Sequence, residues 1–141
     1  MHIVGARPNF VKAAPVIRHV DPNIKQVLIH TGQHYDSKMS DVFFDNLKIP
    51  RPTESLNIGS GTHAVQTGRV MIEIESCLQR YKPELVLVYG DVNSTLGAAI
   101  SAAKMNIKVA HVESGLRSFD RDMPEEINRM IVDRIADYHF V

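Results

Sequence analysis

The stretch Leu85-Val86-Leu87-Val88-Tyr89-Gly90-Asp91 decides the fold, because its first four residues are all apolar. A strand that is apolar on both faces is typical of the centre of a parallel sheet, where helices cover both sides. An Ala-rich segment with helical character follows over 94–105, and a second β-rich run occupies 107–112. This order of strand, helix and strand predicts a βαβ unit.

The same alternation extends in both directions along the chain. We expect further strands over 2–4, 26–31 and 138–141, further helices over 11–20, 38–47, 62–80 and 124–136, and a long loop at 50–61. The predicted fold class is therefore α/β, a Rossmann-like parallel sheet sandwiched by helices.

Composition narrows the class of protein. The 141 residues carry 16 Lys plus Arg and 16 Asp plus Glu, so a nucleic-acid partner is not expected. One domain of this size can bury a core without metal or disulfide staples, and the single cysteine, Cys77, has no partner in the chain. No apolar run is long enough for a membrane span and no signal sequence is recognisable, so we expect a cytoplasmic protein without a membrane partner.

Polar groups gather where the predicted strands end. Ligands of open parallel sheets bind outside the carboxyl ends of the strands, so these loops are the candidate site. The segments concerned are 5–9 with Lys12, 31–36, 90–95 and 113–117, and a fifth segment, 120–129, leads into a helix.

The first of these loops offers positive charge. Gly5 follows a strand and opens a helix, but the loop matches neither a dinucleotide fingerprint nor a P-loop. Arg7, Lys12 and the helix amides would suit an anionic ligand such as a diphosphate. The alternative is that both side chains are solvated surface charges.

Two carboxylates follow strands directly. Asp91 comes after the central strand, where it either faces a cleft or serves as a cap or loop brace for the helix that begins at Ser94. Glu113 is harder to explain as a cap, because Ser114-Gly115 interrupts any helix there, so a functional role is favoured.

A third carboxylate, Glu125, lies at the start of a helix. Asp122 and Glu125 form a pattern like a capping box, and acidic residues favour a helix N-terminus. Glu125 and Arg129 share a helix face, so either they pair or Arg129 positions Glu125 and binds an anion. With Asp91 and Glu113, Glu125 would make an acid/base site. The histidines lack close-set ligand spacing, so no metal is expected.

Taken together, five stretches resemble the UDP-N-acetylglucosamine 2-epimerase family. They are Gly-Ala-Arg-Pro-Asn-Phe-Val-Lys at 5–12, Thr-Gly-Gln-His-Tyr at 31–35, Tyr-Gly-Asp-Val-Asn-Ser-Thr at 89–95, His-Val-Glu-Ser-Gly-Leu-Arg at 111–117 and Pro-Glu-Glu-Ile-Asn-Arg at 124–129. The resemblance covers essentially the whole chain, with the stretches in the order and spacing of the family.

The resemblance implies a GT-B-type fold, of which residues 1–141 would be the N-terminal Rossmann-like domain and the second domain would be absent. It also implies interconversion of UDP-GlcNAc and UDP-ManNAc through loss of the C2 proton, elimination of UDP and its re-addition. No cofactor or metal is required for that chemistry. The full-length form is expected to be a homodimer, and the fragment to be inactive alone.

The resemblance further assigns roles by position. Asp91, Glu113 and Glu125 match the catalytic carboxylates, while Arg7, Lys12 and Arg129 match positions near the substrate. Gln33 and Arg69 fall where some members bind a regulatory UDP-GlcNAc.

Two alternatives stay open at this point. One is the hydrolysing reaction that releases UDP and free ManNAc, and the other is a nucleotide-sugar-binding domain without catalysis.

Overall fold

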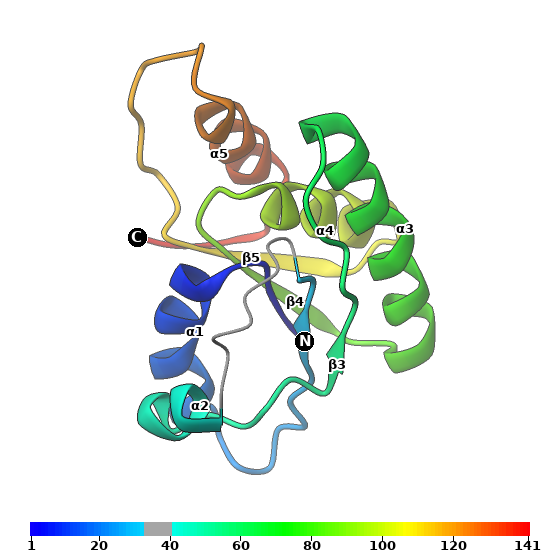
Figure 1. Cartoon of the computed structure of the whole chain (residues 1–141), viewed down its shortest axis with the longest axis vertical. Coiled ribbons are helices and arrows are strands. Elements are labelled where there is room, and N and C mark those ends of the chain that lie inside the picture. Colours follow the sequence, from blue (N-terminus) through cyan, green and yellow to red (C-terminus); the bar gives the residue numbers. More distant parts are fainter. Residues whose placement is uncertain (33–40) are drawn as a thin grey trace.

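The computed structural model describes residues 1–32 and 41–141 and contains a parallel sheet between two layers of helices (Figure 1). The strands are β1 (His2–Val4), β2 (Leu28–His30), β3 (Glu54–Ser55), β4 (Leu85–Tyr89), β5 (Lys108–Val112) and β6 (Tyr138–Phe140). The helices are α1 (Arg7–His19), α2 (Asp41–Leu47), α3 (His63–Tyr81), α4 (Asn93–Lys104) and α5 (Pro124–Ile135).

The strand order is β3-β2-β1-β4-β5-β6, and every neighbouring pair is parallel. This is the order of a doubly wound sheet, whose direction of winding reverses between β1 and β4. The predicted α/β fold class, a Rossmann-like parallel sheet sandwiched by helices, is confirmed.

The central strand β4 contributes to a hydrophobic core on each face. Val86 and Val88 pack with residues of α3, α4 and α5, whereas Leu87 and Tyr89 pack with the core formed with α1 and α2. Figure 1 shows α1 and α2 grouped on one side of the sheet and the other three helices on the opposite side. The apolar run at 85–88 therefore serves two cores at once, as its pattern predicts.

The observed elements differ from the predicted ones mainly at their ends. Helix α1 begins at Arg7 instead of residue 11, because Pro8 fits the first turn of a helix, where its missing N–H costs nothing. The expected loop at 50–61 contains the short strand β3, which pairs with β2 at the sheet edge. Glu54 and Ser55 have no strand periodicity, so the sequence offers no signal for it.

Among the described helices, none is both long and apolar enough to cross a membrane.

Candidate functional site

The candidate site lies at the edge of the sheet where the strands end. Because β1, β4 and β5 are parallel, the loops that follow them leave the same edge. The loops after β1 and β4 also lie on either side of the point where the winding reverses, which is where doubly wound sheets bind ligands.

Asp91, in the loop after β4, pairs with Arg129 of α5. The Nε and Nη2 atoms of Arg129 both donate to Oδ2 of Asp91, at 3.1 and 2.8 Å. Helix α4 begins with Val92 as its N-cap and without a side-chain cap, so the alternative that Asp91 caps this helix is wrong. The Asp91 carboxylate is instead oriented by a cation from another helix.

Arg129 has a second acidic partner, Glu126. Its Nη1 donates to Oε2 of Glu126 at 2.6 Å, and Glu126 also accepts the N–H groups of Ser118 and Phe119. The backbone hydrogen bond from Ser118 is the largest influence that lowers the pKa of Glu126, with Phe119 and Arg129 acting in the same direction. Glu126 thus anchors the chain between β5 and α5, a role that its position beside Glu125 did not indicate.

The pairing of Glu125 with Arg129, one of the two alternatives for these residues, is not formed. Among the described residues, the Arg129 guanidinium bonds only to Asp91 and Glu126, so the two residues that share a helix face do not pair. The expected capping pattern is wrong too, because Met123 is the N-cap of α5 and makes no side-chain cap bond. Pro124 provides the first turn instead.

Glu113, at the end of β5, pairs with Lys12 of α1. Its backbone has φ 69°, a left-handed conformation that costs a non-glycine residue on the order of 1–3 kcal/mol. Gly90 packs against this pair, since a Cβ atom there would lie 3.2 Å from both Glu113 Oε2 and Lys12 Nζ. The loops after β1, β4 and β5 therefore meet at one point, where Lys12 is ion-paired and about a third of its side chain is exposed (34%).

Arg7 lies in the first turn of α1 and is exposed. Its guanidinium carbon stacks 4.7 Å from the ring centroid of Phe43 in α2. The structure thus separates the two cations of the first loop, placing Lys12 against a carboxylate and Arg7 against an aromatic ring.

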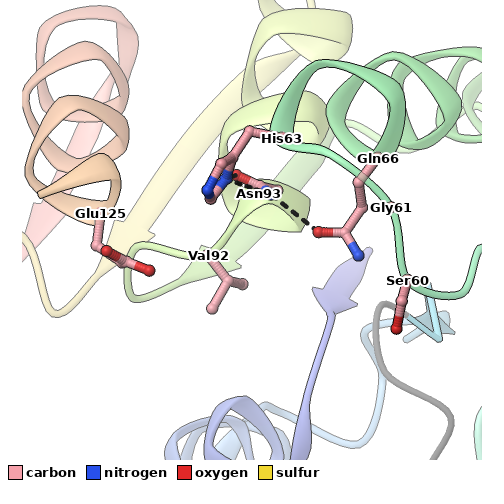
Figure 2. Close-up of a pocket in the computed structure, with 7 residues that line it drawn as sticks. All are labelled: Ser60, Gly61, His63, Gln66, Val92, Asn93 and Glu125. Carbon is pink, nitrogen blue, oxygen red and sulfur yellow. Dashed lines mark hydrogen bonds between the residues drawn. The ribbon is translucent and has the colours of Figure 1, made fainter.

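Glu125 faces a pocket of about 230 Å³ among α3, α4 and α5 (Figure 2). Asn93 donates to Gln66 at 2.8 Å and lies beside the ring of His63, while Asn128 of α5 donates to the Asp91 carbonyl at 2.7 Å. The polar groups lining this pocket come from separate segments. Sequence reasoning singled out Glu125 and the segment 90–95 that contains Asn93, but it missed His63 and Gln66, because their spacing forms no recognisable pattern. The lining residues are Ser60, Gly61, His63, Gln66, Val92, Asn93 and Glu125.

A second group of charged and titratable side chains lies between β5 and α5. His111 of β5 is fully buried, and its Nδ1 lies 2.6 Å from Asp133 Oδ1. Asp133 also accepts hydrogen bonds from the Gly115 N–H and from Arg117. His111 is thus both packed and hydrogen-bonded. The importance of Asp133 was missed, although it lies four residues after Arg129 on α5.

The structure describes one of the two residues expected to bind a regulatory ligand. Arg69 is exposed on α3 and does not line the pocket, and Gln33 lies outside the described residues. In residues 1–32 and 41–141, no group of three or more His, Cys, Asp or Glu side chains could hold a metal ion.

Comparison with known proteins gives consistent matches. The family model for UDP-N-acetylglucosamine 2-epimerase matches residues 18–141. A protein of Methanococcus maripaludis named as a UDP-N-acetylglucosamine 2-epimerase homolog is 56% identical over 138 residues, which are 98% of this chain and 39% of that protein. A Pseudomonas aeruginosa protein named UDP-2,3-diacetamido-2,3-dideoxy-D-glucuronate 2-epimerase is 48% identical, with 98% of this chain and 40% of that protein covered.

Among solved structures, the chain is similar to the crystal structure of Methanocaldococcus jannaschii UDP-GlcNAc 2-epimerase in complex with UDP-GlcNAc and UDP. The TM-score is 0.92 at 52% identity, covering 97% of this chain and 38% of that one. The chain thus spans about two fifths of the length of the relatives that it matches.

Proposed function

This chain belongs to the UDP-N-acetylglucosamine 2-epimerase family, and from that membership we propose that the full-length protein interconverts UDP-GlcNAc and UDP-ManNAc without hydrolysing them. One observation carries the proposal. Asp91, Glu113 and Glu125 come from three segments that end at the edge of the sheet where ligands bind, in a chain 52% identical to a UDP-GlcNAc 2-epimerase.

The chemistry requires a base and a departing diphosphate. A carboxylate takes the proton from C2 while the bond between C1 and the UDP oxygen breaks, so the C2–H electron pair forms a C1=C2 double bond and UDP leaves with the other pair. The intermediate is 2-acetamidoglucal. UDP then adds back to C1 as a proton returns to the opposite face of C2, which inverts that centre.

The described geometry supports a division of roles. Asp91 is held by Arg129 at 2.8 Å, Glu113 is held by Lys12, and Glu125 faces the pocket without a bonded partner among the described residues. Two paired carboxylates and one unpaired carboxylate suit a reaction in which one carboxylate removes or returns the C2 proton and the others contact sugar hydroxyls. Arg7 and Lys12 are the cations that we assign to the diphosphate.

The pocket beside Glu125 supports a site that the rest of the protein completes. Its volume of about 230 Å³ is below the roughly 300–1,000 Å³ of typical ligand pockets. This space would admit a sugar-sized group but not a whole nucleotide sugar. We therefore propose that residues 1–141 are the N-terminal Rossmann-like domain of a two-domain, GT-B-type protein. The homodimer that the family resemblance implies for the full-length form stays a prediction.

The test is to incubate the full-length protein with UDP-GlcNAc in D2O and follow the products by NMR. We expect UDP-ManNAc, with deuterium entering C2 of both sugars because the proton exchanges with solvent. Free ManNAc with stoichiometric UDP would contradict the non-hydrolysing reaction. Asp91→Asn, Glu113→Gln and Glu125→Gln should each slow turnover by about 100-fold or more, whereas Glu73→Gln, on the exposed face of α3, should leave it unchanged.

A second candidate substrate is favoured by the Pseudomonas aeruginosa relative. At 48% identity, it is named for 2-epimerisation of UDP-2,3-diacetamido-2,3-dideoxy-D-glucuronate. The two substrates share the UDP leaving group and the acetamido group at C2 but differ at C3 and C6. The ratio of kcat/KM for the two compounds, measured on the same preparation, decides between them.

A further inference from the structure

His111 is held by hydrogen-bond acceptors on both sides of its ring. Nδ1 lies 2.6 Å from Asp133 Oδ1, and Nε2 lies 2.7 Å from the carbonyl oxygen of Gly90. A carbonyl and an ionised carboxylate can only accept, so both ring nitrogens must donate. The form of the ring that satisfies both contacts is the imidazolium, and the ring is fully buried.

Asp133 provides the matching negative charge. Burial raises its pKa, but hydrogen bonds from Arg117, the Gly115 N–H and His111 outweigh burial and hold the pKa below its ordinary value. Arg117 Nη1 lies 2.6 Å from Oδ2, the oxygen that also accepts the Gly115 N–H at 3.1 Å. The carboxylate is therefore ionised and engaged through both oxygens.

This pair connects the two loops that carry candidate catalytic carboxylates. Through His111 it holds the Gly90 carbonyl, immediately before Asp91. Through Asp133 it holds the Gly115 N–H, two residues after Glu113. His111 of β5 is in turn bonded to Asp133 of α5, the helix whose Arg129 also bonds to Asp91.

We propose that His111 and Asp133 form a buried imidazolium–carboxylate pair that positions Asp91 and Glu113 for the reaction. The proposal rests on the proposed function. Because the ring is fully buried, His111 acts through these two carboxylates and not by contact with a substrate. Both members are positioning residues.

The packing around Gly90 explains why turnover would be sensitive to this pair. A Cβ atom at Gly90 would lie 3.2 Å from both Glu113 Oε2 and Lys12 Nζ, so the peptide held by His111 lies directly against the Glu113–Lys12 pair. If the Gly90 carbonyl loses its donor, the turn before Asp91 and the contact with Glu113 shift together. A misplacement of about 1 Å in an active site can cost roughly 100-fold in rate.

The test compares three variants of the full-length protein. His111→Gln can keep a donor near Nε2 for the Gly90 carbonyl, His111→Asn can keep one near Nδ1 for Asp133, and Asp133→Asn removes the charge. We expect kcat to fall about 10- to 100-fold with KM changed less than about threefold. His111→Gln should retain more activity than His111→Asn, because it preserves the contact with the loop of Asp91.

The matched control is His2→Gln. His2 is also a buried strand histidine with hydrogen bonds from both ring nitrogens, but its partners are Tyr89 Oη and Gln26. It should lose stability while keeping kcat within about twofold of the parent. Folded His111 and Asp133 variants that all keep parental kcat would overturn the proposal.

NMR provides a readout that does not depend on turnover. In the full-length protein labelled uniformly with 15N, the His111 ring should show two protected N–H groups, and Asp133→Asn should shift the amide signals of Gly90 and Gly115 together. A ring with one N–H, or a Gly90 amide unmoved in Asp133→Asn, would overturn the proposal even if a His111 variant failed to fold. A parent without epimerase activity would instead refute the proposed function, and the NMR result would still decide whether the pair holds both loops.

Discussion

At the scale of single residues, the site combines strain with charge pairing. Glu113 takes φ 69° at the end of β5, where its N–H donates to the Phe140 carbonyl at 2.8 Å. A glycine would adopt this conformation without the penalty that a Cβ atom brings. The presence of a carboxylate at a position that favours glycine is the kind of local strain found at functional sites.

This strain predicts a difference between two variants that both remove the carboxylate. Glu113→Gly should unfold at a higher temperature than Glu113→Ala, by the equivalent of about 1 kcal/mol, because only alanine keeps the strained Cβ. Both should lose epimerase activity to the same degree. Thermal unfolding and turnover of the two full-length variants test this, and equal stability would show that the conformation is not strained.

The pH dependence of stability has a predicted contribution from His2. Burial, followed by the nearby N-terminal charge, lowers the pKa of His2 to about 4. Since an unfolded histidine titrates near pH 6.5, the unfolded chain binds the proton first, and this contribution is complete above about pH 6.5 and lost as the pH falls toward 4. The loss amounts to roughly 3 kcal/mol.

The measurement compares thermal midpoints of the parent and His2→Gln between about pH 7 and about pH 4.5. Glutamine can keep a hydrogen bond without titrating, so the variant should lose less stability on acidification than the parent. His19→Gln, which replaces an exposed histidine on α1, is the control and should follow the parent. Parallel curves for the parent and His2→Gln would contradict the assignment.

At the scale of elements, the sequence predicts those with strong periodicity and misses those set by tertiary contact. The run at 85–88 and the amphipathic segment at 62–80 correspond closely to β4 and α3. Strand β3 was missed, because two polar residues become a strand only through pairing with β2. Secondary structure at the sheet edge thus depends on a neighbour distant in the sequence.

Of the candidate site, the sequence likewise predicts some residues and not the contacts between them. Asp91 and Glu113 could be found because each follows an apolar strand, and parallel strands bring such residues to one edge. The partner of Asp91 could not be assigned, because one helix turn presents Glu125, Glu126 and Arg129 in several possible pairings. The orientation of α5 against the sheet selects Glu126 and Asp91 as the partners of Arg129.

The contact between α3 and α4 gives a prediction at this scale. A Cβ atom at Gly97 would lie 2.7 Å from Val70 Cγ1 and 3.1 Å from the Thr67 carbonyl, so Gly97→Ala should cost about 1–3 kcal/mol by overpacking. Gly68 on α3 has nothing within 4 Å of its Cβ position, so Gly68→Ala should stabilise by up to about 1 kcal/mol. Thermal midpoints that change in the same direction for both variants would contradict this packing.

At the scale of the whole molecule, the net charge is zero, but charged side chains are concentrated at one edge of the sheet. The chain has 16 basic and 16 acidic residues, yet Lys12 and Arg129 are both paired with carboxylates at one edge of the sheet. Paired charges of this kind hold side chains in place more than they attract a distant ligand. We therefore expect that a bound diphosphate needs further contacts from the rest of the full-length protein.

We accordingly predict that residues 1–141 alone turn over UDP-GlcNAc at least about 1,000-fold more slowly than the full-length protein, because remote binding contacts and orientation contribute much of the rate. The relatives are longer, and this chain spans 38–40% of their length. The measurement compares both proteins at equal concentration, with circular dichroism to establish that the isolated chain is folded. Adding the remaining segment as a separate chain should restore part of the activity. If the folded isolated chain turned over within about tenfold of the full-length rate, the described edge of the sheet would be a complete active site.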